Sequence, residues 1–335
     1  MSLPRVIDIH THLAGLGGGG TGCFVSTRMQ QSLVYHILKW WTGLKPDDPA
    51  ADEDFAARLA GFVRDSENVD AAVVFGMDGV YDSHGRLVPE KSHLYVPAEH
   101  LFRVCRRDPE RLLPGPSVNP TRADALEELA RVDEAGAVLI KWLAPLQLFD
   151  PSEPKLDPFY EELARRGIPL LAHTGCEHTF PDVAHEYGHA SLFDRALRIG
   201  VTIVFAHCGV ACGFHRAHHQ TEEVLRMIRL HSNLYTDTSA LASFLKFSNL
   251  KKIPFADYPG RFVHGSDYPI PALAAPFAAS LGLKRTLALT FGANPIEADY
   301  QIKLAAGQPR HVFEGATAVL APRIERWLQR VVSRQ

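Results

Sequence analysis

Short apolar runs alternate with amphipathic stretches along almost the whole chain. Most runs carry Val, Ile, Leu and Phe on consecutive positions, which is typical of parallel strands that are buried on both faces. Eight runs are predicted as strands, at residues 6–12, 71–77, 113–118, 138–142, 169–173, 202–207, 234–237 and 262–266.

The stretches between these runs have the start and stop signals of helices. Residues 124–135 end before Gly136, and residues 157–166 begin with an Asp followed by Pro158 and end before Gly167. Residues 191–199 end in the same way before Gly200. Regular alternation of strand and helix predicts an α/β fold of the (β/α)8 TIM-barrel type. A doubly wound sheet is the alternative, but no glycine-rich fingerprint follows the first strand.

The segment between the first two strands breaks this regular spacing. It contains a glycine-rich stretch at 15–22, a predicted helix at 29–41 and a linker rich in Pro and Asp at 45–54. We interpret it as a lid or a pocket wall, because long loops in compact domains are usually functional. A phosphate cradle is less favoured, since the glycines lack the GK[ST] ending. The prediction is one barrel domain over 1–335 with an insertion at about 13–69.

Composition narrows the class of protein. Hydrophobic residues make up 46% and charged residues 22% of the 335 residues, with a net charge of −3, so neither a nucleic-acid nor a membrane partner is expected. We find no signal peptide and no apolar run of about 20 residues. The five cysteines are an odd number, which favours free thiols. These features predict a cytoplasmic protein that acts on a small molecule.

The first strand ends in Asp8-Ile9-His10-Thr11-His12. Side chains two positions apart on a strand point to the same face, so His10 and His12 are predicted to point together into the barrel mouth. Two imidazoles on a rigid strand are suited to zinc and similar metals. Asp8 lies one step deeper on that face and is a candidate to orient a ligating histidine through its other ring nitrogen.

Three other predicted strands end in residues of the same kinds. His173 follows the fifth strand, His207 the sixth, and Asp267 the eighth, each next to a Gly or Pro turn. Strand ends in a barrel converge on one face. Any single member is explained equally well by a core histidine or a turn aspartate, but agreement among four strand ends predicts a shared site.

This ordered set of motifs resembles the amidohydrolase superfamily. The most similar branch is the amidohydrolase-2 group, which includes aminocarboxymuconate semialdehyde decarboxylase, and the resemblance runs from Val6 to about Phe313. It implies a metal-dependent barrel in which a divalent ion, most simply Zn²⁺, is held by His10, His12, His173 and Asp267. It also implies that Asp267 takes a proton from metal-bound water, that His207 is a catalytic acid or electrostatic stabiliser, and that the chain forms a homodimer.

Lys141 leaves the number of metal ions open. It ends the fourth strand, where members of the superfamily with two metals place a carboxylated lysine that bridges them. A carboxylated Lys141 together with His207 would complete a two-metal set of ligands. The alternative is an unmodified lysine that pairs with a carboxylate or contacts the substrate.

Further residues are candidates for the pocket. Glu177 and Trp142 are predicted to contact the substrate, and residues 235–239 to line the pocket without touching metal. A separate zinc site is weakly suggested by His207, Cys208, Cys212, His215, His218 and His219, although their spacing fits no standard pattern.

Three functions are compatible with these residues. The first is a hydrolase that attacks an ester, lactone or amide with metal-activated water. The second is a non-oxidative decarboxylase of an aromatic or unsaturated acid, which needs a cation for the substrate carboxylate, with Arg28, Lys141 and Arg216 as candidates. The third is a barrel that binds metal without catalysis.

Overall fold

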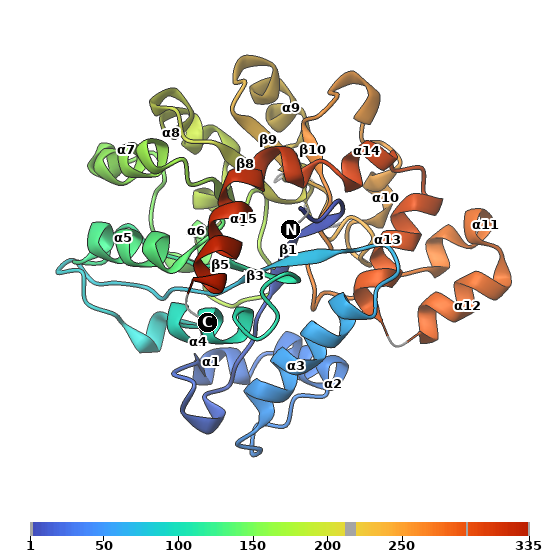
Figure 1. Cartoon of the computed structure of the whole chain (residues 1–335), viewed down its shortest axis with the longest axis horizontal. Helices are drawn as coiled ribbons and strands as arrows, with labels where there is room; N and C mark the ends of the chain where they lie inside the picture. The colour runs from blue at the N-terminus through green and yellow to red at the C-terminus, as the bar shows by residue number, and fades with distance from the viewer. Residues whose placement is uncertain (1–2, 212–218, 293, 334–335) are drawn as a thin grey trace.

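Eight parallel strands form the centre of the molecule in the computed structural model, which describes residues 3–211, 219–292 and 294–333. In Figure 1 these strands gather in the middle and the helices lie around them. The barrel strands are β1 (Ile7–His12), β3 (Ala71–Phe75), β5 (Leu112–Gly115), β6 (Ile140–Trp142), β7 (Leu170–Ala172), β8 (Ile203–Phe205), β9 (Leu234–Asp237) and β10 (Phe262–Val263).

The strands close into a barrel through two seams. Parallel pairing runs β1-β3-β5 in one sheet and β10-β9-β8-β7-β6 in the other. Backbone bonds from Val138 N to Pro114 O (2.8 Å) and from Lys141 N to Pro116 O (2.9 Å) join β5 to β6. Bonds from Ile9 N to His264 O (3.0 Å) and from His12 N to Tyr268 O (2.7 Å) join β1 to β10. All eight predicted strands and the (β/α)8 barrel are therefore confirmed.

The helices around the barrel begin and end largely where the sequence signals predict. The helix at 157–166 is found at those bounds, and the one at 124–135 begins one residue later, with Gly136 and Gly167 in left-handed conformation after them. The α-helices are α1 (Thr27–Gln30), α2 (Leu33–Thr42), α3 (Ala51–Arg64), α4 (Ala98–Cys105), α5 (Ala125–Ala135), α6 (Ala144–Gln147), α7 (Asp157–Arg166), α8 (Asp194–Ile199), α9 (Thr221–Leu230), α10 (Phe247–Leu250), α11 (Ala278–Leu281), α12 (Leu283–Phe291), α13 (Pro295–Ala305), α14 (Arg310–Phe313) and α15 (Ala316–Val332).

The segment between β1 and β3 differs from its prediction in two places. The helix expected at 29–41 is divided into α1 and α2, because Ser32 lies between them and accepts a hydrogen bond from Tyr35 N, capping the second helix. The linker expected at 45–54 ends early, since α3 already begins at Ala51. Acidic residues in the first turn of α3 stabilise that start.

The glycine-rich stretch is folded around a carboxylate of its own chain. Asp52 on α3 is fully buried and accepts hydrogen bonds from Leu16 N (2.6 Å), Gly17 N (3.1 Å) and Thr21 Oγ1 (2.5 Å). A phosphate would need these same donors, and Asp52 already occupies them. The structure therefore does not support the phosphate cradle that was the alternative for this stretch. An antiparallel ribbon of β2 (Phe24–Val25) and β4 (Leu94–Tyr95) ties the segment to the loop after β3.

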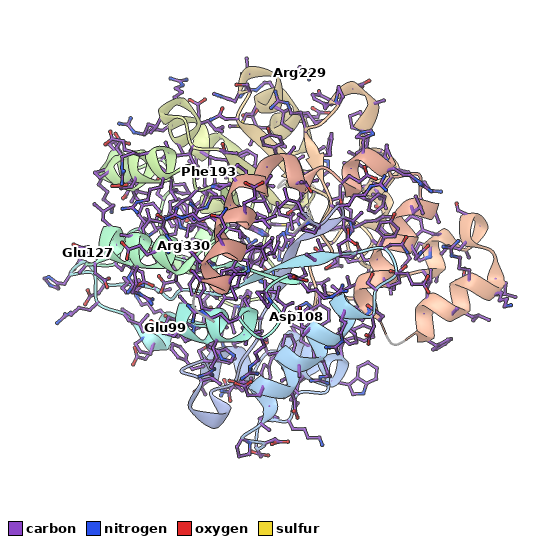
Figure 2. All side chains as sticks on the ribbon, viewed as in Figure 1. Glu99, Asp108, Glu127, Phe193, Arg229 and Arg330 are labelled. Carbon is purple, nitrogen blue, oxygen red and sulfur yellow. The ribbon has the colours of Figure 1, made fainter. Side chains whose placement is uncertain are left out.

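Packing separates an apolar interior from a charged rim. Glu127 and Arg229 are exposed at the outside of the helix layer (Figure 2), whereas Phe193 is fully buried, 5.5 Å from the ring of Phe205. Cys23, Cys105 and Cys208 are buried free thiols, Cys176 is also buried, and Cys212 lies outside the described residues. Within the described ranges, no helix has the length and apolar character needed to span a bilayer.

Candidate metal centre

The two histidines of β1 lie side by side at the carboxyl end of the barrel. Their Nε2 atoms are 3.2 Å apart. The His10 side chain is 1% exposed and the His12 side chain 20% exposed, so the second imidazole lies closer to solvent. This arrangement follows from the alternation of side chains along a strand.

Asp237, at the end of β9, orients the His10 ring. Its Oδ2 lies 2.7 Å from His10 Nδ1, and because a carboxylate only accepts, Nδ1 carries the proton. The lone pair of His10 is therefore on Nε2, which points toward the cavity. Burial, with the Lys141 charge adding to it, lowers the pKa of His10 to about 4, so the ring is neutral and able to bind a metal.

Asp8 binds backbone N–H groups and not the imidazole that the sequence suggested. Its Oδ1 accepts hydrogen bonds from the backbone N of His10 (3.1 Å) and of Ser266 (2.9 Å), and it does not orient a ligating imidazole. The expectation for Asp8 is therefore wrong, since Asp237 already holds Nδ1 of His10. Asp8 instead ties the backbone of β1 to the turn that carries Asp267.

Asp267 brings a carboxylate against both imidazoles of β1. Its Oδ1 is 3.2 Å from His10 Nε2 and 3.2 Å from His12 Nε2. The residue has a φ of 71°, a strained conformation for a side chain other than Gly, and its N donates to His10 O at 2.8 Å. Burial alone would raise its pKa, but the neighbouring His10 and His207 hold the pKa well below its usual value.

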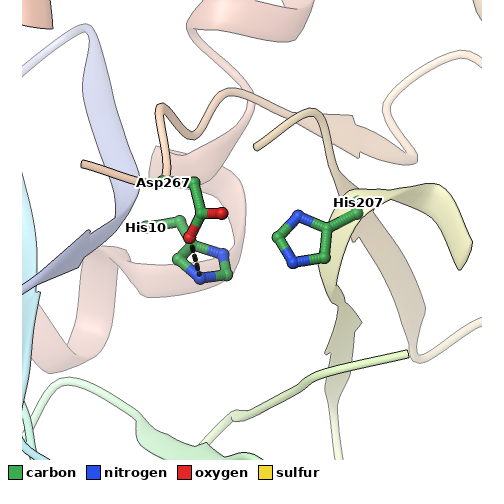
Figure 3. A group of neighbouring side chains, drawn as sticks. All are labelled: His10, His207 and Asp267. Atoms are coloured by element: carbon green, nitrogen blue, oxygen red, sulfur yellow. Dashed lines mark ion pairs between the residues drawn. The ribbon is translucent and has the colours of Figure 1, made fainter. Parts of the chain in front are cut away.

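His207 faces the same space from the turn after β8, as Figure 3 shows with His10 and Asp267. Its Nδ1 lies 3.0 Å from Ser239 O, and since a carbonyl only accepts, Nδ1 is the donor. The lone pair is therefore on Nε2, on the side away from Ser239. The backbone N of His207 also donates to Asp237 Oδ1 at 2.8 Å. Burial lowers the pKa of His207 well below its usual value.

His173, directly after β7, has a buried ring nitrogen without a partner. Nε2 of this ring makes no hydrogen bond with any described residue, and the ring lies 5.1 Å from that of His207. On the other side, Nδ1 is 3.8 Å from Glu177 Oε2. A buried unpaired nitrogen is costly unless a ligand satisfies it. Glu177 itself is buried and lines the cavity, where it was expected.

Lys141 on β6 approaches the centre from the opposite wall. Its Nζ is 3.0 Å from His10 Nε2 and 4.9 Å from the centre of the Phe75 ring. The side chain is 1% exposed, and burial lowers its pKa to about 8. The lysine thus lies in direct contact with the imidazole predicted as a metal ligand.

Trp142 points away from the cavity, so its expected substrate contact is wrong. It is fully buried, its Nε1 donates to Val118 O at 2.7 Å, and its ring packs at 4.8 Å from Phe149 and 5.5 Å from Phe159. Lys141 precedes it on the same strand, and neighbouring strand residues face opposite sides. Because Lys141 faces the barrel interior, Trp142 faces the helix layer.

A single cavity brings the predicted residues together. Its walls include residues from the β1–β3 segment, such as Leu16, Met29 and Leu38, which places that segment over the site. Polar groups form its floor: His10, His12, Lys141, His173, Glu177, His207 and Asp267.

These donors fit a divalent ion. One ligand atom each from His10, His207 and Asp267 lie within 4.8 Å of one another, and the same Asp267 oxygen contacts His12. Imidazole nitrogens with one carboxylate are the donors that zinc and similar ions prefer. His173, whose Nε2 is unpaired, lines the same cavity.

Some candidates do not belong to this centre. Arg28 is exposed, and its Nε pairs with Asp182 Oδ2 at 3.1 Å. Its charge therefore already has a carboxylate partner within the protein. The residues Cys212, His215, Arg216 and His218 lie outside the described residues, and with them half of the suggested second zinc site.

The residue that sequence reasoning undervalued is Asp237. It was placed in the pocket lining, yet it holds the ring of His10 and the backbone of His207 at once. The available signal was its position as a carboxylate at the end of a barrel strand, like Asp267.

Comparisons with known proteins agree with this geometry. The family model described as amidohydrolase matches residues 7–318. The chain belongs to the amidohydrolase family. The expected resemblance is thereby confirmed, and with it an enzyme of the amidohydrolase type. No protein with a curated description matches the chain by sequence.

Solved structures similar to this amidohydrolase share its fold at low identity. One, described as a probable 2-pyrone-4,6-dicarboxylic acid hydrolase from Acinetobacter baumannii, is 14% identical with a TM-score of 0.52, covering 95% of this chain and 99% of that chain. A 5-carboxyvanillate decarboxylase from Sphingomonas paucimobilis is 14% identical, with a TM-score of 0.52 and coverage of 96% and 99%. A 4-oxalomesaconate hydratase from Rhodopseudomonas palustris is 16% identical, with a TM-score of 0.52 and coverage of 97% and 98%.

Proposed function

We propose that this amidohydrolase is a metal-dependent hydrolase that cleaves an ester, lactone or amide bond of a small molecule with activated water. The observation that carries the proposal is the position of Asp267. Its Oδ1 contacts the Nε2 atoms of both His10 and His12 at 3.2 Å, so a proton acceptor lies directly beside the candidate metal ligands. A base next to activated water is the requirement for hydrolysis.

His10, His12, His173 and Asp267 would hold one divalent ion, with Zn²⁺ as the proposed metal. The neutral rings of His10 and His173 support this assignment, because a metal ligand must offer a lone pair. Such an ion, when bound, lowers the pKa of water and polarises a carbonyl oxygen. We propose that Lys141 is unmodified, since its Nζ lies 4.9 Å from the centre of the Phe75 ring, a contact that favours an ammonium.

Asp267 and His207 divide the proton transfers. The low pKa of Asp267 keeps its carboxylate ionised at neutral pH, ready to take a proton from the attacking water. His207 is neutral with its lone pair on Nε2, so it would accept that proton from Asp267 there and pass it on to the leaving group. This role as an acid follows from the hydrogen bond of Nδ1 to Ser239 O, which fixes the tautomer.

Leu13, Leu16, Met29 and Leu38 supply an apolar wall over the polar floor of the cavity. Such a wall suits a substrate with an apolar or aromatic body and one reactive polar group. A small-molecule substrate is proposed on this basis.

The test is a panel of aryl esters, lactones and amides assayed by acid release, with metal content measured on the same samples. We expect activity that a chelator removes and Zn²⁺ restores. Asp267→Asn should lower kcat about 10²- to 10⁴-fold, whereas Asp257→Asn, a matched change at an exposed aspartate, should leave it unchanged. A protein that binds metal but cleaves none of the panel would contradict the hydrolase and favour the other reactions.

A decarboxylase is the second candidate. The names of the three similar structures all refer to carboxylic acids, and one of them is a decarboxylase. The buried cation of Lys141 in the cavity supports this candidate, because a carboxylate substrate needs a positive partner. Release of carbon dioxide from aromatic acids, measured against acid release from esters, separates the two reactions.

A further inference from the structure

His93 is a buried histidine in the wall of the cavity and is not one of the candidate metal ligands. The residue is 5% exposed and lines the cavity together with Val25, Met29 and Leu94. These neighbours are apolar, so the imidazole is the polar group of this part of the wall. A few polar groups placed among apolar ones are what fixes the orientation of a ligand in such a cavity.

The ribbon of β2 and β4 holds His93 in place. Val25 pairs with Leu94 in this antiparallel ribbon, so the next pair in the same register is Ser26 opposite His93. Ser26 N donates to His93 O at 3.3 Å, and Ser26 Oγ lies 2.8 Å from His93 Nδ1. Because the backbone and the ring are held by the same residue, the imidazole has a fixed direction for binding a ligand.

The hydroxyl hydrogen of Ser26 decides which nitrogen of His93 carries a proton. Ser26 is buried, and its Oγ accepts from Met29 N at 3.1 Å, which leaves His93 Nδ1 as its other partner among the described residues. If Nδ1 were the donor, the hydroxyl hydrogen would be buried without an acceptor, which is costly. The hydroxyl therefore donates to Nδ1, and the proton of the neutral ring is on Nε2.

The Nε2–H of His93 is available to a ligand. Nε2 makes no hydrogen bond with any described residue, and it does not belong to the unpaired atoms that are sealed off from open space. The open space beside this residue is the cavity that it lines. Burial lowers the pKa of His93, so the ring is neutral at pH 7. A protonated ring would also donate from Nε2, so the direction of this bond does not depend on the charge.

We propose that His93 is a specificity-determining residue that donates a hydrogen bond from Nε2 to an oxygen atom of the substrate away from its reactive group. The inference rests on the proposed function only in requiring that the substrate occupies this cavity. It adds that the apolar body of the substrate carries a second oxygen-bearing group, such as a carbonyl, carboxylate or hydroxyl. A molecule without this oxygen leaves the N–H unpaired, so the site selects against it.

The test compares pairs of benzohydroxamates that carry either an acetyl or an isopropenyl group at the meta or the para position. The hydroxamate binds divalent ions and anchors the probe at the metal centre. The two substituents have the same shape, but only the acetyl group has an acceptor oxygen. Titration calorimetry on the full-length, zinc-loaded protein measures the ratio of the two dissociation constants. At one position or both, we expect the acetyl probe to bind about 10- to 100-fold more tightly, because its partner leaves a buried donor unpaired.

Variants at the ring identify the donor. His93→Phe keeps a flat ring without an N–H and should bind the two probes of a pair equally, whereas His93→Gln, whose amide can donate, should keep the preference. His84→Phe, at an exposed histidine of the same loop, should match the wild type. A purely structural role would weaken both probes and leave their ratio unchanged. A wild type that binds the two probes of every pair equally, or a preference that His93→Phe keeps, would overturn the proposal.

The tautomer of His93 provides a second measurement that needs no probe. Heteronuclear NMR of the imidazole rings distinguishes a ring nitrogen that carries a proton from one that does not, and the signals of His93 are those missing from His93→Gln. We expect Nε2 to carry the proton in the wild type. A neutral ring with its proton on Nδ1 would contradict the proposal, because Nε2 would then have no hydrogen to donate.

The binding test is independent of turnover. A protein that cleaves no ester but shows the ratio that depends on His93 would contradict the hydrolase and retain the role of His93. An active hydrolase that binds the two probes of every pair equally would contradict only the role of His93.

Discussion

Asp237 accepts a hydrogen bond from the Nδ1–H of His10 at 2.7 Å, and this contact decides which nitrogen of the ring faces the metal centre. The aspartate is fully buried and does not line the cavity that contains His10 and His207, so it acts on that cavity through the groups that it holds. The groups that it holds include the ring of His10 and the backbone of His207.

Asp237→Asn should therefore weaken metal binding without removing a ligand. The amide keeps an acceptor but loses the charge that favours the correct tautomer, and partners of this kind typically contribute 10- to 100-fold in metal affinity. Competition with a chelator measures the dissociation constant, with Asp257→Asn as the exposed control. An unchanged constant would mean that the ring of His10 is oriented by other contacts.

His10 and His207 should respond differently to the same substitution. His10→Asn should lose bound metal and activity together, because it removes a proposed ligand. His207→Asn should keep metal while kcat falls about 10²- to 10⁴-fold, the usual contribution of a general acid. Elemental analysis and kinetics on the same samples separate the two outcomes. Loss of metal from His207→Asn would make this histidine a ligand and favour a centre with two ions.

His264 should make the fold sensitive to acid. It is fully buried, neither ring nitrogen has a hydrogen-bond partner among the described residues, and burial holds its pKa well below 6.5. Below pH 6.5 this imidazole binds a proton in the unfolded chain but not in the folded chain. The contribution of His264 to the unfolding free energy is therefore retained above that pH and lost as the pH falls.

His264→Phe should reduce that loss, since the phenyl ring does not titrate. The difference in unfolding free energy between variant and wild type should grow by about 1.4 kcal/mol for each pH unit below the usual histidine pKa. Urea unfolding at pH 7.5 and at pH 5.5 measures it. Parallel pH dependences in the two proteins would show that His264 already carries a proton in the folded state.

Lys303 and Asp299 should stabilise the turn before Asp267 as a pair. Lys303 Nζ is fully buried and donates to Asp299 Oδ2 and to Gly265 O, each at 2.6 Å. Lys303→Met leaves the Asp299 carboxylate buried alone, which should cost about 3–5 kcal/mol in unfolding free energy. The double variant with Asp299→Leu should recover much of this loss, and a double variant no more stable than the single one would refute the pairing.

The sequence predicted the barrel because its pattern is local. Each strand is a run of apolar residues with both faces buried, and the helix ends at Gly136 and Gly167 have explicit signals. The division of the 29–41 helix at Ser32 was not predicted, since a cap and an interior serine look alike until the neighbouring turn is known.

The candidate site was predictable as a set of strand ends, but not as a set of contacts. Alternation along a strand placed His10 and His12 together, and the same rule applied to β6 would have turned Trp142 away from the cavity once Lys141 faced it. The partner of His10 depends on β9 lying within reach of β1, which no local pattern contains.

The pairing of β1 with β10 also determines at what stage of protein synthesis the candidate metal centre can form. His10 O accepts the N–H of Asp267, so the first strand and the last one meet at the candidate metal ligands. During synthesis His10 and His12 are made more than 250 residues before Asp267. The full set of ligands therefore becomes available to a cellular metal only after Asp267 has been made and the last barrel strand can pair with the first.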